Sequence, residues 1–194
     1  MALIADKIIL NPKATASAPS GSEGSLYYDS DKEALMSYGD SWQMVSRTTG
    51  SGGTITTYTG FKVHTFLSDG TFSVSGGVLV CDIPMVGGGG SGGGRHAGGG
   101  GGGGVLSITG ASLPTGSYDI NVGDGGAGTS GSVRGNSGEN TTFMGEAAKG
   151  GGAGGSYNGV AGLTGGSGGG GGYQSSGDAG GSSQPGPTNY TGTG

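Results

Sequence analysis

The side chains that could bind a metal ion or attack a substrate are few in this chain. It has one cysteine, Cys81, and two histidines, His64 and His96. A structural zinc site takes four Cys or His ligands at short, regular spacings, and these three residues are not spaced in that way. A single cysteine also cannot form an intrachain disulfide, which is compatible with folding in a reducing compartment. We therefore expect no metal site in this protein.

Two short patterns are similar to known ligand-binding motifs. Asp29, Asp31 and Glu33 alternate as the ligands of a calcium loop do, but the glycine and the distal glutamate of an EF-hand are missing. The G-x-G-x-x-G pattern of dinucleotide-binding folds recurs because glycine is so abundant, and no helical hydrophobic pattern follows it. We expect the acidic residues to form a solvated turn, and we expect no nucleotide or other cofactor.

The sequence also offers no set of residues for covalent catalysis. Glycine strings that contain serine, such as residues 131–135, abound, but none lies in the strand–turn–helix context of a nucleophile elbow. A hydrolase would further need a base and an orienting acid held on rigid elements, and the chain has only two histidines. We therefore expect that the protein is not an enzyme.

The charge balance argues against nucleic acid as a partner. The chain has 8 basic and 13 acidic residues, a net charge of -5, whereas binding to a phosphate backbone needs clustered cations. No apolar stretch approaches the ~20 residues of a transmembrane helix. The first residues also lack the basic and apolar regions of a signal peptide. We expect no nucleic-acid partner, no membrane insertion and synthesis in the cytoplasm.

Binding is the chemistry that the sequence supports best. Aromatic, cationic and amide residues interrupt the glycine-rich half of the chain in pairs. If the glycine runs fold into rigid hairpins, residues at their apices are exposed and can contact a sugar or a protein surface. The alternative is that these residues only end glycine helices and fill gaps. The candidate receptor contacts are Arg95, His96, Tyr157, Asn158, Tyr173 and Gln174.

The elements that must position these residues are dominated by glycine. Residues 87–194 hold 44 of the 54 glycines, including the unbroken run 98–104. Such a segment cannot bury an ordinary core or form stable α-helices. It is either a flexible coil or a set of extended helices with three residues per turn, packed side by side through backbone hydrogen bonds. β-branched and aromatic segments at intervals favour the ordered alternative, because a disordered linker would not need them.

The first 49 residues predict a small β-meander. Three short apolar runs, 26–28, 34–38 and 42–45, are separated by turn residues. Residues 30–33 could instead cap a short helix, and residues 7–10 are a further strand candidate. We expect this module to be held together by a core of Leu26, Tyr27, Leu35, Tyr38 and Trp42.

The rest of the chain predicts a mainly β fold with almost no helix. Residues 50–57 read as a linker to a glycine-rich β domain, residues 58–194. In that domain the side chains of residues 60–67 alternate between two faces, as in a strand. Asp69–Gly70 predict a tight turn from this strand into residues 71–74, and hence a hairpin. Further strands are expected at 78–83, 105–109, 117–122 and 140–143. They would form a β base that carries long glycine-rich excursions, either polyglycine II-like or irregular.

Several stretches resemble proteins of bacteriophage particles. Residues 24–29 (GSLYYD) and 35–42 are similar to a short module of phage tail fibres with the pattern G-x-L-Y-(Y/F)-(D/N)…W. Residues 61–90 resemble the start of the glycine-rich domain of phage tail-fibre proteins. Residues 118–128 and 135–143 are similar to the later strands of that domain.

The resemblance implies a structural virion protein, a tail-fibre or head-fibre subunit made in the host cytoplasm. Such proteins are usually homotrimers, and the low apolar content of this chain also favours burial between chains. The N-terminal module would attach to other virion proteins, and the glycine-rich part would face the host. Domains of this kind tend to close with an apolar strand, whereas this sequence stops at residues 191–194, so we expect a short variant or a piece of a longer protein.

Two alternatives share these sequence features. One is a host-recognition adhesin that itself binds a surface glycan or protein through the candidate contacts. The other is a glycine-rich extracellular structural protein, which we would expect to carry a secretion signal.

Overall fold

The computed structural model describes residues 12–14, 18–21, 23–30, 34–45, 48–157, 159–173, 181 and 190–191. The described residues form strands and extended segments and contain no α-helix, so the prediction of a mainly β fold is confirmed. The chain divides into two compact units, Met1–Thr49 and Gly50–Gly194, and each is described by itself. The strand candidate at residues 7–10 lies outside the described residues.

The first unit is a four-stranded sheet in the order β1-β2-β3-β4. β2 (Leu26–Asp29), β3 (Ala34–Tyr38) and β4 (Trp42–Met44) pair antiparallel in chain order, and β1 (Pro12–Lys13) runs parallel to β2. The predicted meander is therefore confirmed, and the alternative of a helix after residue 30 is wrong.

The core of the first unit lies on one face of this sheet. Tyr27 and Met36 are buried there as cross-strand partners, and Trp42 packs against Tyr27 with ring centroids 4.6 Å apart. Tyr38 makes a similar edge contact to Trp42 at 5.2 Å, and the Trp42 indole donates a hydrogen bond of 2.9 Å to the Pro19 carbonyl. Tyr27, Tyr38 and Trp42 thus lie in the expected cluster.

Two details of the predicted core are wrong. Leu26 and Leu35 pair with Ser37 and Tyr28, which places them on the opposite face of the sheet. Leu26 is 45% exposed and Leu35 is half-buried, while the core position opposite Tyr27 belongs to Met36. Successive strand residues alternate between faces, so neighbouring apolar residues cannot all enter one core.

The expectation that Asp29 belongs to a solvated turn is also wrong. Asp29 is the last residue of β2 and is buried, and the Tyr27 hydroxyl donates a hydrogen bond of 2.8 Å to its carboxylate. A carboxylate can be buried when such partners satisfy it. Asp31 and Glu33 lie outside the described residues.

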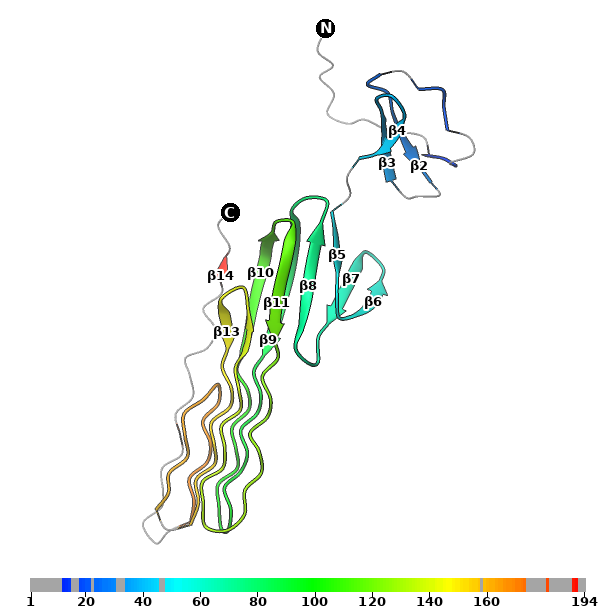
Figure 1. Ribbon diagram of the computed structural model, residues 1–194. Coiled ribbons are helices and arrows are strands. Elements are labelled where there is room, and N and C mark those ends of the chain that lie inside the picture. The colour runs from blue at the N-terminus through cyan, green and yellow to red at the C-terminus, as the bar shows by residue number, and fades with distance from the viewer. Residues whose placement is uncertain are drawn as a thin grey trace. The chain divides into compact units, whose positions relative to one another are not determined.

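The second unit begins with a β-sandwich (Figure 1). One sheet has the order β13-β12-β11-β8-β5, and the other has the order β14-β10-β9. β14 runs parallel to β10. The strands are β5 (Thr49–Ser51), β8 (Gly70–Ser75), β9 (Leu79–Val86), β10 (Val105–Leu113), β11 (Gly116–Asn121), β12 (Thr141–Phe143), β13 (Glu146–Ala148) and β14 (Tyr190–Thr191).

The inner faces of the two sheets form one hydrophobic core. The five-stranded sheet contributes Phe72, Val74, Phe143 and Ala148, and the three-stranded sheet contributes Met85, Ile108, Ala111 and Leu113. Inward positions on β9 alternate with exposed ones, as expected for a strand with one buried face. This core fixes the ends of the strands from which the glycine-rich segments leave.

Residues 50–57, which we expected to be a linker, lie mostly in strands. β6 (Thr54–Tyr58) pairs antiparallel with β7 (Phe61–Thr65) through a two-residue turn, in which Gly60 has a φ of 82°. The predicted hairpin around Asp69 is therefore wrong, because β7 pairs back with β6 while β8 pairs with β11. The Asp69 carboxylate instead accepts a hydrogen bond of 2.7 Å from the Val122 amide.

Beyond the sandwich the chain runs out and back as extended segments (Figure 1). We call the described residues of 87–104, 122–140 and 149–173 the glycine array. Its backbone hydrogen bonds recur every third residue: the amides of Gly87, Gly90 and Gly93 donate to the carbonyls of Gly104, Gly101 and Gly98. A three-residue repeat is the period of a polyproline II-type helix, so the glycine runs are ordered helices of the polyglycine II kind.

One segment, residues 149–156, lies at the centre of the array. It exchanges backbone hydrogen bonds with segments 87–94, 98–104, 133–139 and 160–170. Residues 150–156 are all buried. In a helix with three residues per turn, successive amides and carbonyls point in different directions around the axis. In this segment they form hydrogen bonds with neighbouring segments on several sides.

At most interior positions of this packing glycine is required because there is no room for a side chain, although the central segment also buries Ala153 and Ser156. A Cβ atom built on Gly151 would lie 2.0 Å from the Gly101 carbonyl oxygen, closer than real Cβ contacts allow. At Gly99, on the outside of the array, a Cβ would meet nothing within 4 Å. The array is thus held by backbone contacts that only the smallest residue permits.

Candidate functional site

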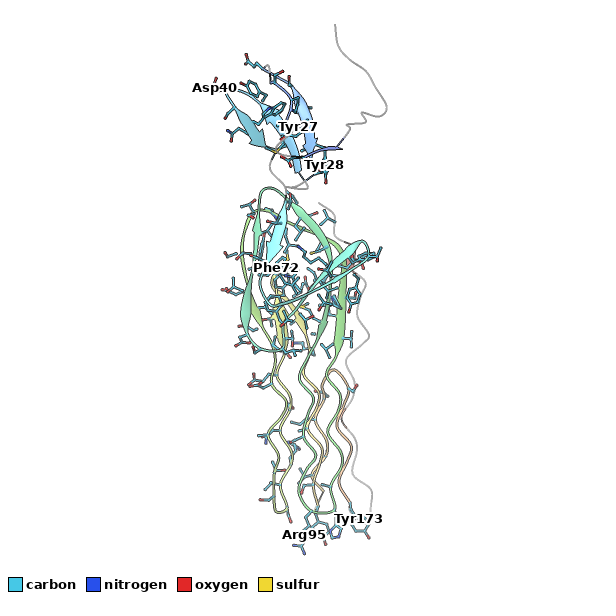
Figure 2. The ribbon with its side chains drawn as sticks, turned by 90° about the vertical axis from the view of Figure 1, so that its right-hand side faces the viewer. Tyr27, Tyr28, Asp40, Phe72, Arg95 and Tyr173 are labelled. Carbon is cyan, nitrogen blue, oxygen red and sulfur yellow. The ribbon has the colours of Figure 1, made fainter. Side chains whose placement is uncertain are left out.

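The candidate receptor contacts gather where the array turns, at the end away from the β-sandwich. Figure 2 shows Arg95 and Tyr173 at this end. We call residues 94–97, 129–133, 156–160 and 173 the distal end of the array. Four of the six residues singled out in the sequence lie in it: Arg95, His96, Tyr157 and Tyr173. Asn158 and Gln174 lie outside the described residues.

The His96 ring is the centre of an aromatic cluster. Its centroid lies 5.7 Å from that of Tyr157 and 6.1 Å from that of Tyr173, with both ring pairs tilted by 53°. Tyr157 is half-buried, whereas Tyr173 is 66% exposed. Arg95 and His96 are exposed as well. Three separate segments of the chain therefore present one group of aromatic and cationic side chains to solvent.

Backbone and hydroxyl hydrogen bonds hold these turns together. The Tyr173 amide donates to the His96 carbonyl at 2.8 Å, and the Gly93 amide donates to the Gly98 carbonyl at 3.1 Å across the first turn. The Ser156 hydroxyl, which is buried, donates to the Gly94 carbonyl at 2.7 Å. The side chains of the distal end thus project from a backbone that is fixed on several sides.

The first of these turns has an uncommon backbone conformation. Arg95 and His96 have φ angles of 52° and 48°, in the left-handed region that costs a residue with a side chain about 1–2 kcal/mol. Glycine would adopt these angles without that cost. A chain with 54 glycines in 194 residues thus carries two large side chains at adjacent positions whose backbone angles glycine would adopt without strain.

Arg95 is the one charged side chain among the described residues of the distal end, and it is positive. Arg95 lies in the first turn, and Arg134 follows residue 133 and donates a hydrogen bond of 2.9 Å to the Ala161 carbonyl. The nearest acidic residues in the array, Asp124 and Glu139, bond to each other through their backbones close to the sandwich. The distal end is therefore positively charged, whereas the chain as a whole has a net charge of -5.

Two hydroxyl residues of the distal end were not found from the sequence. Ser156 and Thr129 both donate to carbonyls of the first segment, at Gly94 and Gly92. Both stand where a glycine run is interrupted just before a turn, and this position is a signal that could have identified them. Their role is to tie the turns together.

The residues considered for metal or covalent chemistry do not come together. His64 lies on β7, where its Nδ1 is 2.8 Å from the Gly52 carbonyl oxygen and its ring packs on Phe72. Cys81 lies on β9 at the edge of the core, where burial and, to a smaller extent, the charge of Asp82 raise the pKa of its thiol. Within the described ranges, no group of three or more His, Cys, Asp or Glu residues could hold a metal ion.

The described part of the chain also contains no helix that is long and apolar enough to cross a membrane.

Fold and site together define a class: a small β-sandwich that carries a polyglycine array with aromatic and cationic residues at its far end. Residues 63–194 match the family model of the glycine-rich domain, and because this match covers more than half of the sequence, the chain belongs to that family. No curated protein and no solved structure matches the chain.

Proposed function

We propose that this chain is a structural virion protein of a bacteriophage, a tail-fibre or head-fibre subunit that contributes to host attachment without catalysis. One observation carries the proposal: Arg95, His96, Tyr157 and Tyr173 gather at the distal end of an ordered glycine array. An attachment protein needs exposed contact residues held away from the part that anchors it. The resemblance of residues 24–29 and 61–90 to phage tail fibres supports the same proposal.

The array suits this role because it is stiff and chemically uniform. Its segments are joined by backbone hydrogen bonds at every third residue, and most positions of its packed interior have no space for a side chain. A preorganised contact surface loses less conformational entropy on binding than a flexible one. In this proposal the array is a scaffold, and specificity comes from the side chains at its distal end.

The N-terminal module would attach the subunit to other virion proteins. Its sheet is closed on one face by Tyr27, Met36 and Trp42, while Leu26 and Val45 are exposed apolar residues. Exposed apolar side chains on a small sheet suit contact with another protein. Leu26, which is not a core residue of its own module, would then act in this attachment.

We further propose that the subunit is a homotrimer. The outer face of the three-stranded sheet carries Val80, Val86 and Val105, each more than half exposed, and Val86 and Val105 are cross-strand neighbours. Burial of such a row against a second copy would remove apolar surface from water.

Sedimentation analysis of the purified chain tests the proposed trimer, and a monomer at micromolar concentration would count heavily against it. Val86→Glu should shift the population toward monomer, whereas Val133→Glu, at an exposed position of the distal end, should not.

The test of the proposed location is electron microscopy of the phage particles, labelled with an antibody against the purified chain. We expect label on fibres of the tail or head, with the N-terminal module at the particle. Absence of the chain from particles would overturn the proposal. Label in a cell wall or extracellular matrix would favour the glycine-rich extracellular protein instead.

The exposed aromatic cluster favours the second candidate, an adhesin that binds the host receptor directly. The two candidates differ in what substitution of the distal end does. Under the adhesin hypothesis, Arg95→Ala combined with Tyr173→Ala abolishes attachment of particles to cells. Unchanged attachment would remove the adhesin role and leave the structural one.

A further inference from the structure

We propose that the distal end binds an acidic saccharide, with Arg95 pairing with the acid group and the rings of Tyr173 and His96 packing against the sugar. The inference rests on the proposed function in that the distal end is taken to face a host surface, and it adds the chemical class of the ligand.

The charge of the site selects an anion. Arg95 is exposed, and Arg134 follows Val133, whose carbonyl accepts a hydrogen bond from the Gly94 amide. The described residues of the distal end include no carboxylate. The guanidinium of Arg95 can donate two parallel hydrogen bonds to a carboxylate or a phosphate group. The net charge of -5 repels anions elsewhere, so an acidic ligand would be directed to this end.

The aromatic rings select a ligand with a flat face that carries C–H groups. The exposed ring of Tyr173 and the ring of His96 lie side by side with centroids 6.1 Å apart. The negative face of an aromatic ring attracts the polarised C–H groups of a sugar. Tyrosine also supplies a rigid contact area and a hydroxyl at small entropic cost. A saccharide with an acid group would use the rings and Arg95 at the same time.

The small size of the site favours a saccharide over a protein. A stable protein–protein interface buries ~800 Å² on each partner and uses about 20–30 residues. The large side chains that the described distal end offers are Arg95, His96, Val133, Tyr157, Val160 and Tyr173, of which Tyr157 and Val160 are half-buried. One or two sugar rings match such an area.

The strained turn supports a binding role for its side chains. Arg95 and His96 adopt left-handed angles that glycine would adopt without strain, so their side chains oppose the stability of the turn. Met144, the other left-handed residue with a side chain among the described residues, also lies in a two-residue turn, between β12 and β13, but there the second position is Gly145, whereas the turn at 95–96 carries a large side chain at both positions. Strain of this kind clusters at ligand-binding sites, where the surrounding structure holds it.

Binding of the full chain to an array of immobilised saccharides tests the inference. The array carries sugars with carboxylate, phosphate or sulfate groups beside neutral sugars of the same backbone. We expect acidic members to be retained at least about tenfold more strongly than their neutral counterparts, a difference that one good ionic contact provides. Multivalent display raises the apparent affinity of a weak single site to a measurable level.

Matched variants identify the site. Arg95→Gln should weaken retention of the acidic sugars about tenfold, and Tyr173→Ala should weaken retention of every bound sugar. Lys149→Gln, which removes the same charge from an exposed residue at the start of the central segment, should leave binding unchanged.

Three results would overturn the inference: no retention of any acidic sugar, equal retention of neutral sugars, or equal losses in the Arg95 and Lys149 variants. If particles attach to cells through Arg95 and Tyr173 while no saccharide binds, the receptor is a protein. The inference then fails and the proposed function stands. If acidic sugars bind as expected but the chain is absent from particles, the proposed function fails and the saccharide site stands.

Discussion

The Ser156 hydroxyl donates a hydrogen bond of 2.7 Å to the Gly94 carbonyl oxygen, across 62 positions of sequence. Both residues are buried, and each stands directly before a turn of the distal end. Ser156 ends the central segment of the array, and Gly94 precedes the strained pair Arg95 and His96. The bond therefore joins the packed interior of the array to the residues proposed to meet a ligand.

Ser156→Ala should loosen the distal end. The substitution removes the donor and leaves the buried Gly94 carbonyl without it, at a cost of about 1–3 kcal/mol. Amide hydrogen exchange should increase at residues 94–97 and 156–157, while the sandwich strands keep their protection. Ser130→Ala, at an exposed position of the neighbouring turn, serves as the control. Equal exchange in the two variants would show that the hydroxyl does not hold the turn.

Replacing a glycine should be tolerated on the outer face of the array and should destabilise the protein in the interior of the array. Gly151→Ala places a Cβ 2.0 Å from the Gly101 carbonyl oxygen, and overpacking of this kind costs about 1–3 kcal/mol or more. Gly99→Ala meets nothing within 4 Å and should be neutral or stabilise by about 0.4–1 kcal/mol, because alanine restricts the unfolded chain. Thermal unfolding of both variants measures the difference. If the two midpoints move together, the glycine segments are not packed as described.

Substitution of Leu113 should destabilise the sandwich core. This residue is 0% exposed, whereas Leu67 is 89% exposed. Leu113→Ala should therefore lower the free energy of unfolding by about 2–5 kcal/mol through lost burial and the cavity left behind. The same change at Leu67 should lie within about 0.5 kcal/mol of zero. Urea unfolding followed by circular dichroism measures both, and a small effect at Leu113 would contradict the assigned core.

The Cys81 thiol should make stability depend on alkaline pH. Burial, with a smaller contribution from the negative charge of Asp82, raises the pKa of this thiol in the folded chain. The folded state thus keeps a proton that the unfolded chain loses first. The contribution to stability is complete below the ordinary thiol pKa of about 8.5 and is lost as pH rises through the folded pKa.

Urea midpoints of the wild-type chain and of Cys81→Ala between neutral and alkaline pH isolate this effect, since every other ionisable residue is the same in both. The wild-type midpoint should fall more steeply. Asp82→Asn keeps an acceptor oxygen for the Gly110 amide and should reduce the slope only in part. Parallel profiles for wild type and Cys81→Ala would contradict the prediction.

Strands were predictable from the sequence where apolar residues alternate or cluster. The meander at 26–45 and the strands around 78–83, 105–109 and 117–122 follow from local pattern, and β2 to β4, β9, β10 and β11 confirm them. Which strands pair with each other was harder to predict from the sequence. Asp69–Gly70 has the composition of a hairpin turn, yet Thr59–Gly60 makes the hairpin and Asp69 bonds to Val122. Long-range pairing outweighed the local signal.

For the site, the sequence indicated which residue types interrupt the glycine runs but not which of them meet. Arg95 lies 62 positions before Tyr157, and Tyr173 follows 16 positions later. Only the register of the array brings the three residues to one end. That register is set by backbone hydrogen bonds, which leave no trace in side-chain pattern because glycine has none. The buried Ser156 does leave a trace, as a hydroxyl residue that interrupts a glycine run just before a turn, but the sequence does not show which carbonyl it meets.

The three-residue repeat of the array also limits how its length can evolve. An insertion that preserves the hydrogen bonds between Gly87, Gly90 and Gly93 and their partners must add residues in threes, and every adjoining segment must grow by the same amount. At ~3.1 Å per residue, each step extends the reach by about 9 Å. Related chains should therefore differ in reach by discrete increments, while the residues carried at the tip can vary freely between them.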